Sequence, residues 1–231
     1  MLTTTLALLA LQWQGALPDA SRLAEGQSCY TVSSMRDGQA IPMGVTRQMI
    51  RRERDGERAV LRITVHQVIG GGAFDMRDDF VVDASTLAPI SLVNTRQGKV
   101  HVNVTFGPDR IQGWRMTEGN TVPIDVPLER PIWDGNLYGL LFASLPLAEG
   151  ARFAVPFWQY DKGFGQFTVR VTGSEMVGTP TGPTEAWVLD AGSSDEQRLT
   201  YLISKSDHRE LGYRAGRGSQ ALGGDCSALT P

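Results

Sequence analysis

Residues 133–146 read WDGNLYGLLFASLP and form the one segment for which the sequence predicts a helix. Asp134 is suited to accept a hydrogen bond from an amide of the first turn. Leu137, Leu141 and Leu145 follow at a four-residue spacing, which places them on one face of a helix that the final proline ends. Because the flanking segments alternate apolar and polar residues, we expect this helix to lie against one large sheet.

The rest of the chain has the two-residue periodicity of strands. Leu61, Ile63 and Val65 alternate with polar residues, and residues 100–106 (VHVNVTF) do so again. About a dozen such runs follow at hairpin spacing, without an internal repeat or a strand–helix–strand rhythm. We therefore predict a mainly β fold, in which one large curved antiparallel sheet forms a half-open barrel and the single helix packs on its concave side.

The length and composition fit one domain after a short leader. The chain has 231 residues, 41% of them hydrophobic, with 26 glycines and 12 prolines for turns. We predict a signal peptide over residues 1–20, because its apolar run is long enough for export and too short to cross a membrane. The alternative is that this run forms a first strand or helix of the fold. Residues 21–231 contain no linker and are predicted to be a single β-rich domain. No other segment approaches membrane-spanning length.

Cys29 and Cys226 are the only cysteines and lie near the two ends of the predicted domain. Neither has a second cysteine at the short spacing of a zinc site. A bond between them would close a long loop and would persist in an oxidising compartment, whereas the alternative is two unrelated thiols. We predict a disulfide and a periplasmic or extracellular location. We also expect the glycine-rich segment from Ala215 onward to be loosely ordered until Cys226 fixes it.

The charge and histidine patterns disfavour several classes of function. The net charge is −3 and lysines and arginines form no basic run, so we expect no nucleic-acid partner. His66, His101 and His208 lack the spacing of metal ligands, so we expect no metal and no other cofactor. No Gly-x-Ser-x-Gly elbow is present. We therefore expect a protein that is not an enzyme.

Asp75 and Asp79 are the one pair of carboxylates that merits a catalytic hypothesis. Their spacing would place both on one face of a strand, where they would act as acid and base in glycoside hydrolysis. Arg77 between them suits an exposed strand edge equally well. A hydrolase that uses this pair is therefore a minor alternative.

Aromatic residues are dense on both sides of the predicted helix, namely Trp114, Trp133, Phe153, Phe157, Trp158, Tyr160, Phe164 and Phe167. Such side chains either fill a core or line the concave apolar space that a curved sheet leaves under a helix. The candidate residues for lining such a cavity are Trp114, Trp133, Leu137, Leu141, Leu145, Phe157 and Trp158.

Three segments carry a resemblance to a known family: residues 80–90 (FVVDASTLAPI), residues 145–147 (LPL) before Gly150, and residues 171–175 (VTGSE). In this order they resemble exported bacterial proteins of unknown function that are similar to the half-open β-barrels of the LolA and LolB lipoprotein carriers. The resemblance implies an unclosed barrel, a helix that plugs its mouth and an apolar cavity between them. It implies no catalytic residues.

Together these features favour a non-enzymatic exported protein that holds a hydrophobic or amphipathic, lipid-like ligand between sheet and helix. The alternative from a different class is a structural protein of the cell envelope that pairs with a protein partner through its sheet edges.

Overall fold

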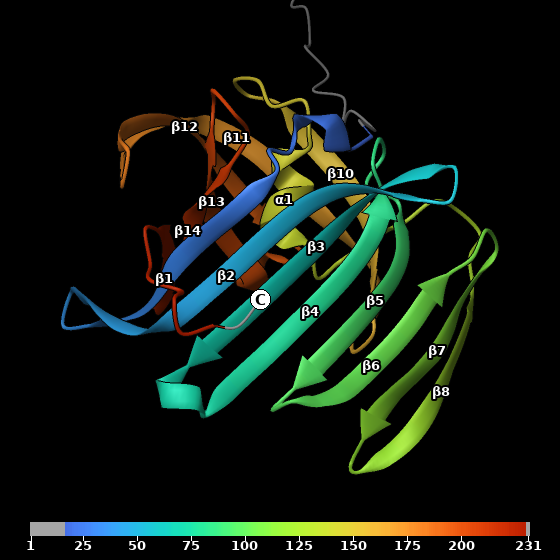
Figure 1. The fold of residues 1–231 in the computed structure, drawn as a ribbon. Helices are drawn as coiled ribbons and strands as arrows, with labels where there is room; N and C mark the ends of the chain where they lie inside the picture. Colours follow the sequence, from blue (N-terminus) through green and yellow to red (C-terminus); the bar gives the residue numbers. More distant parts are fainter. Residues whose placement is uncertain (1–16, 230–231) are drawn as a thin grey trace, which may run out of the picture.

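The computed structural model describes residues 17–229, and in it one continuous 15-stranded sheet curves around a short helix (Figure 1). The strand order is β8-β7-β6-β5-β4-β3-β2-β1-β15-β14-β13-β12-β11-β10-β9. The two edge strands, β8 and β9, do not pair with each other, so the sheet is open and barrel-like rather than a closed barrel. The predicted mainly β architecture is confirmed.

The N-terminal half of the sheet is a meander in which each strand pairs with the next. Its strands are β1 (Gly26–Arg36), β2 (Gln39–Asp55), β3 (Arg58–Ile69), β4 (Phe74–Asp83), β5 (Pro89–Arg96), β6 (Lys99–Phe106), β7 (Arg110–Thr117) and β8 (Asn120–Pro127), with the 3-10 turns η1 (Ala20–Arg22) and η2 (Gly70–Gly72). Leu61 and Ile63 are buried as their alternation predicts.

The C-terminal half begins at the opposite edge and returns to β1. Its elements are β9 (Trp133–Asp134), α1 (Tyr138–Ala143), β10 (Arg152–Gln159), β11 (Gly163–Thr179), β12 (Gly182–Gly192), η3 (Asp195–Gln197), β13 (Arg198–Ser204), β14 (Glu210–Ala215) and β15 (Gly218–Leu222). β9 pairs with β10 in parallel, and the other pairings are antiparallel.

Most of the predicted signal peptide, residues 1–16, lies outside the described residues. Pro18 and Ala20, which we expected within the leader, are buried against the domain. The Asp19 amide donates to the Ser144 carbonyl at 2.9 Å, and the Ala20 amide donates to the Ser85 carbonyl at 2.8 Å. The signal peptide over residues 1–20 stays a prediction.

The glycine-rich end of the chain is ordered, and it is held by strand pairing as well as by the disulfide. β15 lies inside the sheet between β1 and β14, with Val32 opposite Gln220 and Gly212 opposite Ala221. We expected Cys226 alone to fix this segment, whereas backbone hydrogen bonds on both sides also hold the strand. After β15, a Cβ at Gly224 would lie 2.6 Å from the carbonyl carbon of Tyr30, so glycine permits this close crossing.

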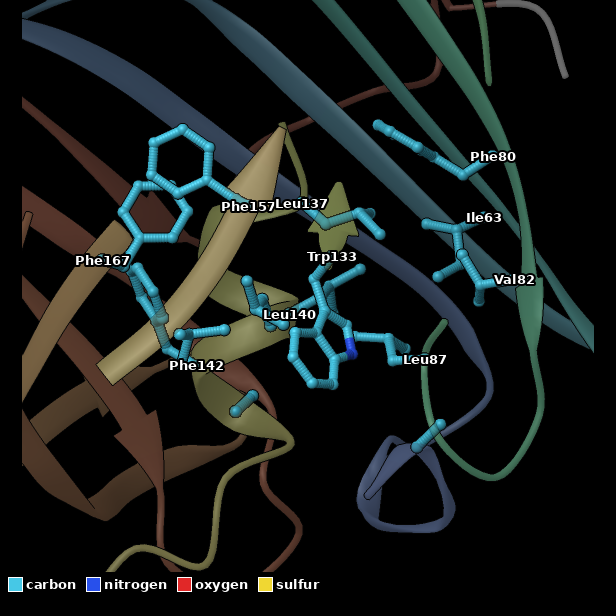
Figure 2. Close-up of a cluster of buried hydrophobic side chains, with 14 of the residues drawn as sticks. Ile63, Phe80, Val82, Leu87, Trp133, Leu137, Leu140, Phe142, Phe157 and Phe167 are labelled. Atoms are coloured by element: carbon cyan, nitrogen blue, oxygen red, sulfur yellow. The ribbon is translucent and has the colours of Figure 1, made fainter. Parts of the chain in front are cut away.

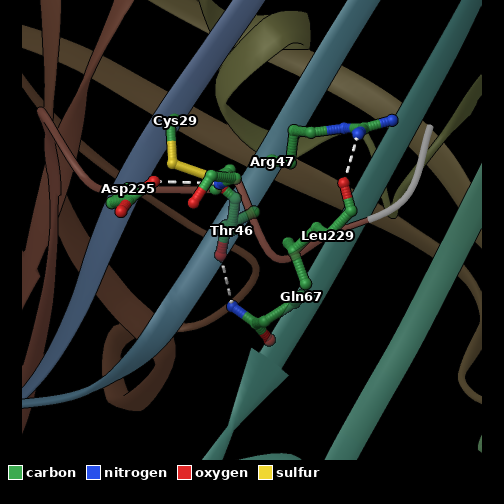
Figure 3. Close-up of a disulfide and its surroundings, with 8 residues drawn as sticks. Cys29, Thr46, Arg47, Gln67, Asp225 and Leu229 are labelled. Atoms are coloured by element: carbon green, nitrogen blue, oxygen red, sulfur yellow. Dashed lines mark hydrogen bonds between the residues drawn. A yellow bond between two sulfur atoms is a disulfide. The ribbon is translucent and has the colours of Figure 1, made fainter.

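The predicted disulfide is confirmed, because Cys29 and Cys226 are bonded with their Cα atoms 5.8 Å apart (Figure 3). The amides of Gly223 and Gly224 donate to the Cys29 carbonyl, and Arg47 Nη1 donates to the Leu229 carbonyl at 2.7 Å. Residues 223–229 thus cross β1 and β2 on the side of the sheet that faces away from the core.

The helix α1 is shorter than predicted. It begins at Tyr138 and ends at Ala143, so Leu145 lies beyond its end. Asp134 does not cap it, because residues 133–134 pair with β10 and the Asp134 carboxylate accepts instead from the Asn136 amide at 2.9 Å. Residues 133–134, which we predicted at the start of the helix, thus form a strand instead.

The core lies between α1 and the inner face of the sheet. Figure 2 shows Trp133 and Leu137 facing Ile63, Phe80 and Val82 of β3 and β4. Each large apolar side chain buried in this way contributes about 1.5–3 kcal/mol. The predicted position of the helix, on the concave side of the sheet, is therefore correct although its length is not.

Removing the disulfide should loosen the end of the chain without releasing β15. The bond spans 197 residues, and closing so long a loop is worth about 5 kcal/mol in the simple chain model. We expect a Cys29→Ser/Cys226→Ser variant to melt roughly 10 °C lower. Hydrogen exchange should rise in residues 223–229 while residues 218–222 stay protected. Loss of protection in both segments below the melting transition would contradict this.

Candidate functional site

Two adjoining cavities lie on the inner side of the sheet beside α1, with volumes of about 370 and 360 Å³. Tyr138, Tyr201 and Tyr213 line both of them, so the cavities share a wall at the start of the helix. Each volume is at the lower end of the range for small-molecule sites. Together they form one candidate site with two unlike compartments.

The first compartment, which we call the aromatic cavity, is lined by Tyr138, Phe142, Phe167, Leu199, Tyr201 and Tyr213 among others. The Phe142 ring meets the Phe167 ring edge-on with centroids 5.3 Å apart, and it meets the Tyr201 ring edge-on at 5.0 Å. Polar side chains of Gln159, Lys162, Ser193 and Gln197 also line it. Such a wall suits an apolar group, because rings offer large apolar area in fixed positions.

The second compartment, which we call the polar cavity, is lined by Asp78, Arg96, Asn136, Tyr138, Glu210 and Gln220 among others. Asp78 comes from β4, Arg96 from β5 and Glu210 from β14, so the two halves of the sheet both contribute. Leu137 and Leu140 add apolar area. This lining suits a polar or charged group.

Tyr138 stands at the boundary between the compartments. It is 38% exposed, although it lies at the first position of an otherwise buried helix. Gln159 Nε2 donates to the Tyr138 hydroxyl at 2.9 Å and to the Gly135 carbonyl at 2.8 Å. Gln159 is itself buried and therefore fixes the phenol in place.

Two carboxyl groups of the polar cavity are almost completely buried. Asn94 Nδ2 donates to Asp78 Oδ1 at 2.6 Å, yet burial raises the pKa of Asp78 to about 6. Burial likewise raises the pKa of Glu210 to about 7, against the opposing effect of a hydrogen bond from Gln48. Desolvation disfavours the charged form of each group, so both titrate near neutral pH.

A third buried carboxyl group lies next to the polar cavity. Burial raises the pKa of Asp134 to about 7, and the nearby charge of Asp78 acts in the same direction. The amide and side chain of Asn136, which lines the cavity, both donate to Asp134 Oδ1 at 2.9 Å. Three buried carboxyl groups, those of Asp78, Asp134 and Glu210, therefore lie in the interior beside α1.

The predicted cavity residues are distributed unevenly. Leu137 lines the polar cavity. Five others are buried within the packed core, namely Trp133, Leu141, Leu145, Phe157 and Trp158. Trp114 is half-buried on β7, opposite Pro123 of the edge strand. As direct ligand contacts these six residues stay untested.

Sequence reasoning missed Asp78 and Glu210. Asp78 had a recognisable signal, because it alternates with Phe80 and Val82 and therefore shares the core-facing side of β4. Glu210 offered none, since it begins a strand of only six residues whose pairing with β13 is irregular.

Asp75 and Asp79 occupy the opposite face of β4, away from both cavities. Asp75 Oδ1 lies 2.9 Å from His66 Nε2. Asp79 accepts from Arg77 Nε at 2.8 Å and from Thr64 Oγ1 at 2.6 Å. These carboxylates are tied to cross-strand and same-strand neighbours on the outer surface, so their placement gives the hydrolase hypothesis no support.

Most of the chain matches one known protein family. Residues 29–219 match the model of a protein family of unknown function, DUF3108. The chain belongs to this family. No curated protein matches it. Among the helices of residues 17–229, none combines the length and apolar character needed to cross a membrane.

This DUF3108 protein is similar in fold to a beta-barrel-like protein of the domain of unknown function DUF1849 from Brucella abortus. The two are 9% identical with a TM-score of 0.54, over 87% of this chain and 97% of that one. The hypothetical lipoprotein YmcC from Escherichia coli K12 is 12% identical with a TM-score of 0.31, over 93% and 91% of the two chains. The first likeness shows a shared barrel-like fold, and the resemblance to LolA and LolB stays a prediction.

Replacing Glu210 with glutamine should stabilise the protein at about pH 8. The folded pKa of about 7 exceeds the ordinary value of 4.5, so the folded chain binds the proton more tightly than the unfolded chain does. This contribution to stability is complete below about pH 4.5 and is lost as the pH rises through about 7. We expect the Glu210→Gln variant to gain roughly 1–3 kcal/mol in free energy of unfolding at about pH 8, and much less at about pH 5.

Urea denaturation at the two pH values measures this difference. The matched control is Glu185→Gln, because Glu185 is exposed on β12 and pairs with Lys205. The prediction would be contradicted by an equal change in both variants, or by a lower stability of Glu210→Gln at the higher pH. Either result would show that the buried Glu210 carboxylate does not destabilise the folded protein.

Proposed function

We propose that this protein is a non-enzymatic, exported binding protein that holds a hydrophobic or amphipathic, lipid-like ligand between its sheet and α1. The observation that carries the proposal is the pair of adjoining cavities with unlike linings. An apolar chain gains free energy by leaving water for the aromatic cavity, at about 25 cal/mol for each Å² that is buried. A polar head group would find hydrogen-bonding partners in the polar cavity.

The disulfide supports an exported location. The Cys29–Cys226 bond joins two ends of the fold, and disulfides of this kind persist in oxidising compartments such as the periplasm or the extracellular space. Export fits a carrier or sensor of lipid-like molecules in the cell envelope.

The sheet edges give less support to the alternative of a structural protein that pairs with a partner. Edge strand β8 contains Pro123 and Pro127, which lack an amide hydrogen, and prolines at an edge discourage the addition of another strand. The other edge strand, β9, has only two residues. We therefore favour ligand binding.

Filling the aromatic cavity should prevent binding. Ser193 is exposed at the cavity lining, so Ser193→Trp would place a large ring at the cavity with little disturbance of the core. We expect the affinity for an apolar fluorescent dye to fall about tenfold or more, since one buried ring-sized contact is worth roughly 1.5–3 kcal/mol. Fluorescence titration measures this affinity.

Ser194→Trp is the matched control, because Ser194 is also exposed in the same loop but does not line the cavity. Native mass spectrometry and lipid extraction of wild-type protein, purified from its own host, provide the second test. Absence of any extracted lipid, together with absence of dye binding, would refute the proposal.

A further inference from the structure

From the charges around the polar cavity we infer that it binds the cationic amine head group of an amphipathic ligand whose apolar chain lies in the aromatic cavity. This inference rests on the proposed function and specifies its ligand class. It assigns Asp78 and Glu210 as the groups that recognise the head group.

The charged side chains that line the polar cavity are mostly acidic. Asp78, Asp161 and Glu210 carry carboxyl groups, and Arg96 is the one lysine or arginine in this lining among the described residues. Asp134 lies just behind the lining, through Asn136. An anionic head group would meet like charges there, whereas a cation would meet opposite ones.

Arg96 does not neutralise the two buried carboxyl groups by direct contact. Its Nη2 donates to the Tyr160 hydroxyl at 3.1 Å, and its guanidinium carbon lies 6.0 Å from the centre of the Tyr160 ring. Within residues 17–229 no ion pair joins Arg96 to Asp78 or Glu210. The arginine is thus held toward β10, and its charge acts on Asp78 from a distance rather than through an ion pair.

One carboxylate oxygen of Asp78 can accept a further hydrogen bond. Only 5% of its surface is exposed, and its Oδ1 accepts from Asn94, whereas no group in the described part of the chain donates to Oδ2. A buried carboxylate without full pairing is costly, and an ammonium group supplies both the charge and the N–H donors that would complete it.

Glu210 lines the same cavity from the other half of the sheet. It too is only 5% exposed, and it packs against the helix backbone at Gly139, where a Cβ would overlap its carboxylate. Tyr138, one residue earlier, borders the aromatic cavity. A ligand with its amine in the polar cavity would therefore direct its chain past Tyr138 toward Phe142.

Three ligands with the same ten-carbon chain test the inference: decylammonium, 1-decanol and decanoate. Their small head groups carry charges of +1, 0 and −1, so a comparison at neutral pH isolates the effect of head-group charge. We expect the full chain to bind decylammonium about tenfold more tightly than 1-decanol, and decanoate most weakly, since a hydrogen bond to a charged group is worth roughly 1.5–3 kcal/mol. Isothermal titration calorimetry measures the three affinities.

Asp78→Asn should lower the affinity for decylammonium about tenfold and leave the affinity for 1-decanol unchanged. Asp79→Asn is the matched control, because it removes the same charge from the adjacent residue on the outer face of β4 and should change neither affinity. Circular dichroism checks that each variant folds. If Asp78→Asn does not fold, the same measurements are made on the Glu210→Gln variant.

Equal binding of the three ligands, tighter binding of decanoate, or an equal loss for decylammonium and 1-decanol in the variant would overturn the inference. In each of these cases the protein still binds ten-carbon chains, so the proposed function stands. Binding of none of the three ligands would refute the proposed function instead.

Discussion

The pairing of β1 with β15 is the constraint on which the rest of the structure depends. The N-terminal meander and the C-terminal strands would otherwise be two separate sheets, because no other strand pairing joins them within residues 17–229. The Cys29–Cys226 bond lies at this junction and limits how far the two halves can separate. Asp78 belongs to one half and Glu210 to the other, so the polar cavity exists only while the junction is intact.

The helix α1 derives its stability from the sheet that surrounds it. Six residues are too few for a helix to persist alone in water. Leu140, Leu141, Phe142 and Ala143 are buried, and their packing against the inner face supplies what the local sequence lacks. Because the helix is short, it does not fill the concave side, and the two cavities flank its first residue.

The buried carboxyl groups make this interior unlike an ordinary β-sheet core. Asp78, Asp134 and Glu210 each lose hydration, and apolar residues of similar size would cost less free energy in the empty protein. Strongly shifted pKa values cluster at functional sites for this reason. Two of these groups, Asp78 and Glu210, line the polar cavity that Tyr138 borders.

Local sequence patterns by themselves determined the mainly β class, most hairpins, the presence of one helix and the pairing of Cys29 with Cys226. Period-two alternation and turn residues are properties of neighbouring positions, and two cysteines permit a single intrachain bond. The tertiary structure alone decided the length of α1, the place of β15 and the lining of the cavities. Each of these depends on partners far apart in the chain, as when the Tyr30 hydroxyl bonds the Glu210 carbonyl across 180 positions. Alternation can show that Asp78 faces inward, but only the curvature of the whole open sheet and the pairing of β1 with β15 bring Glu210 to the same cavity.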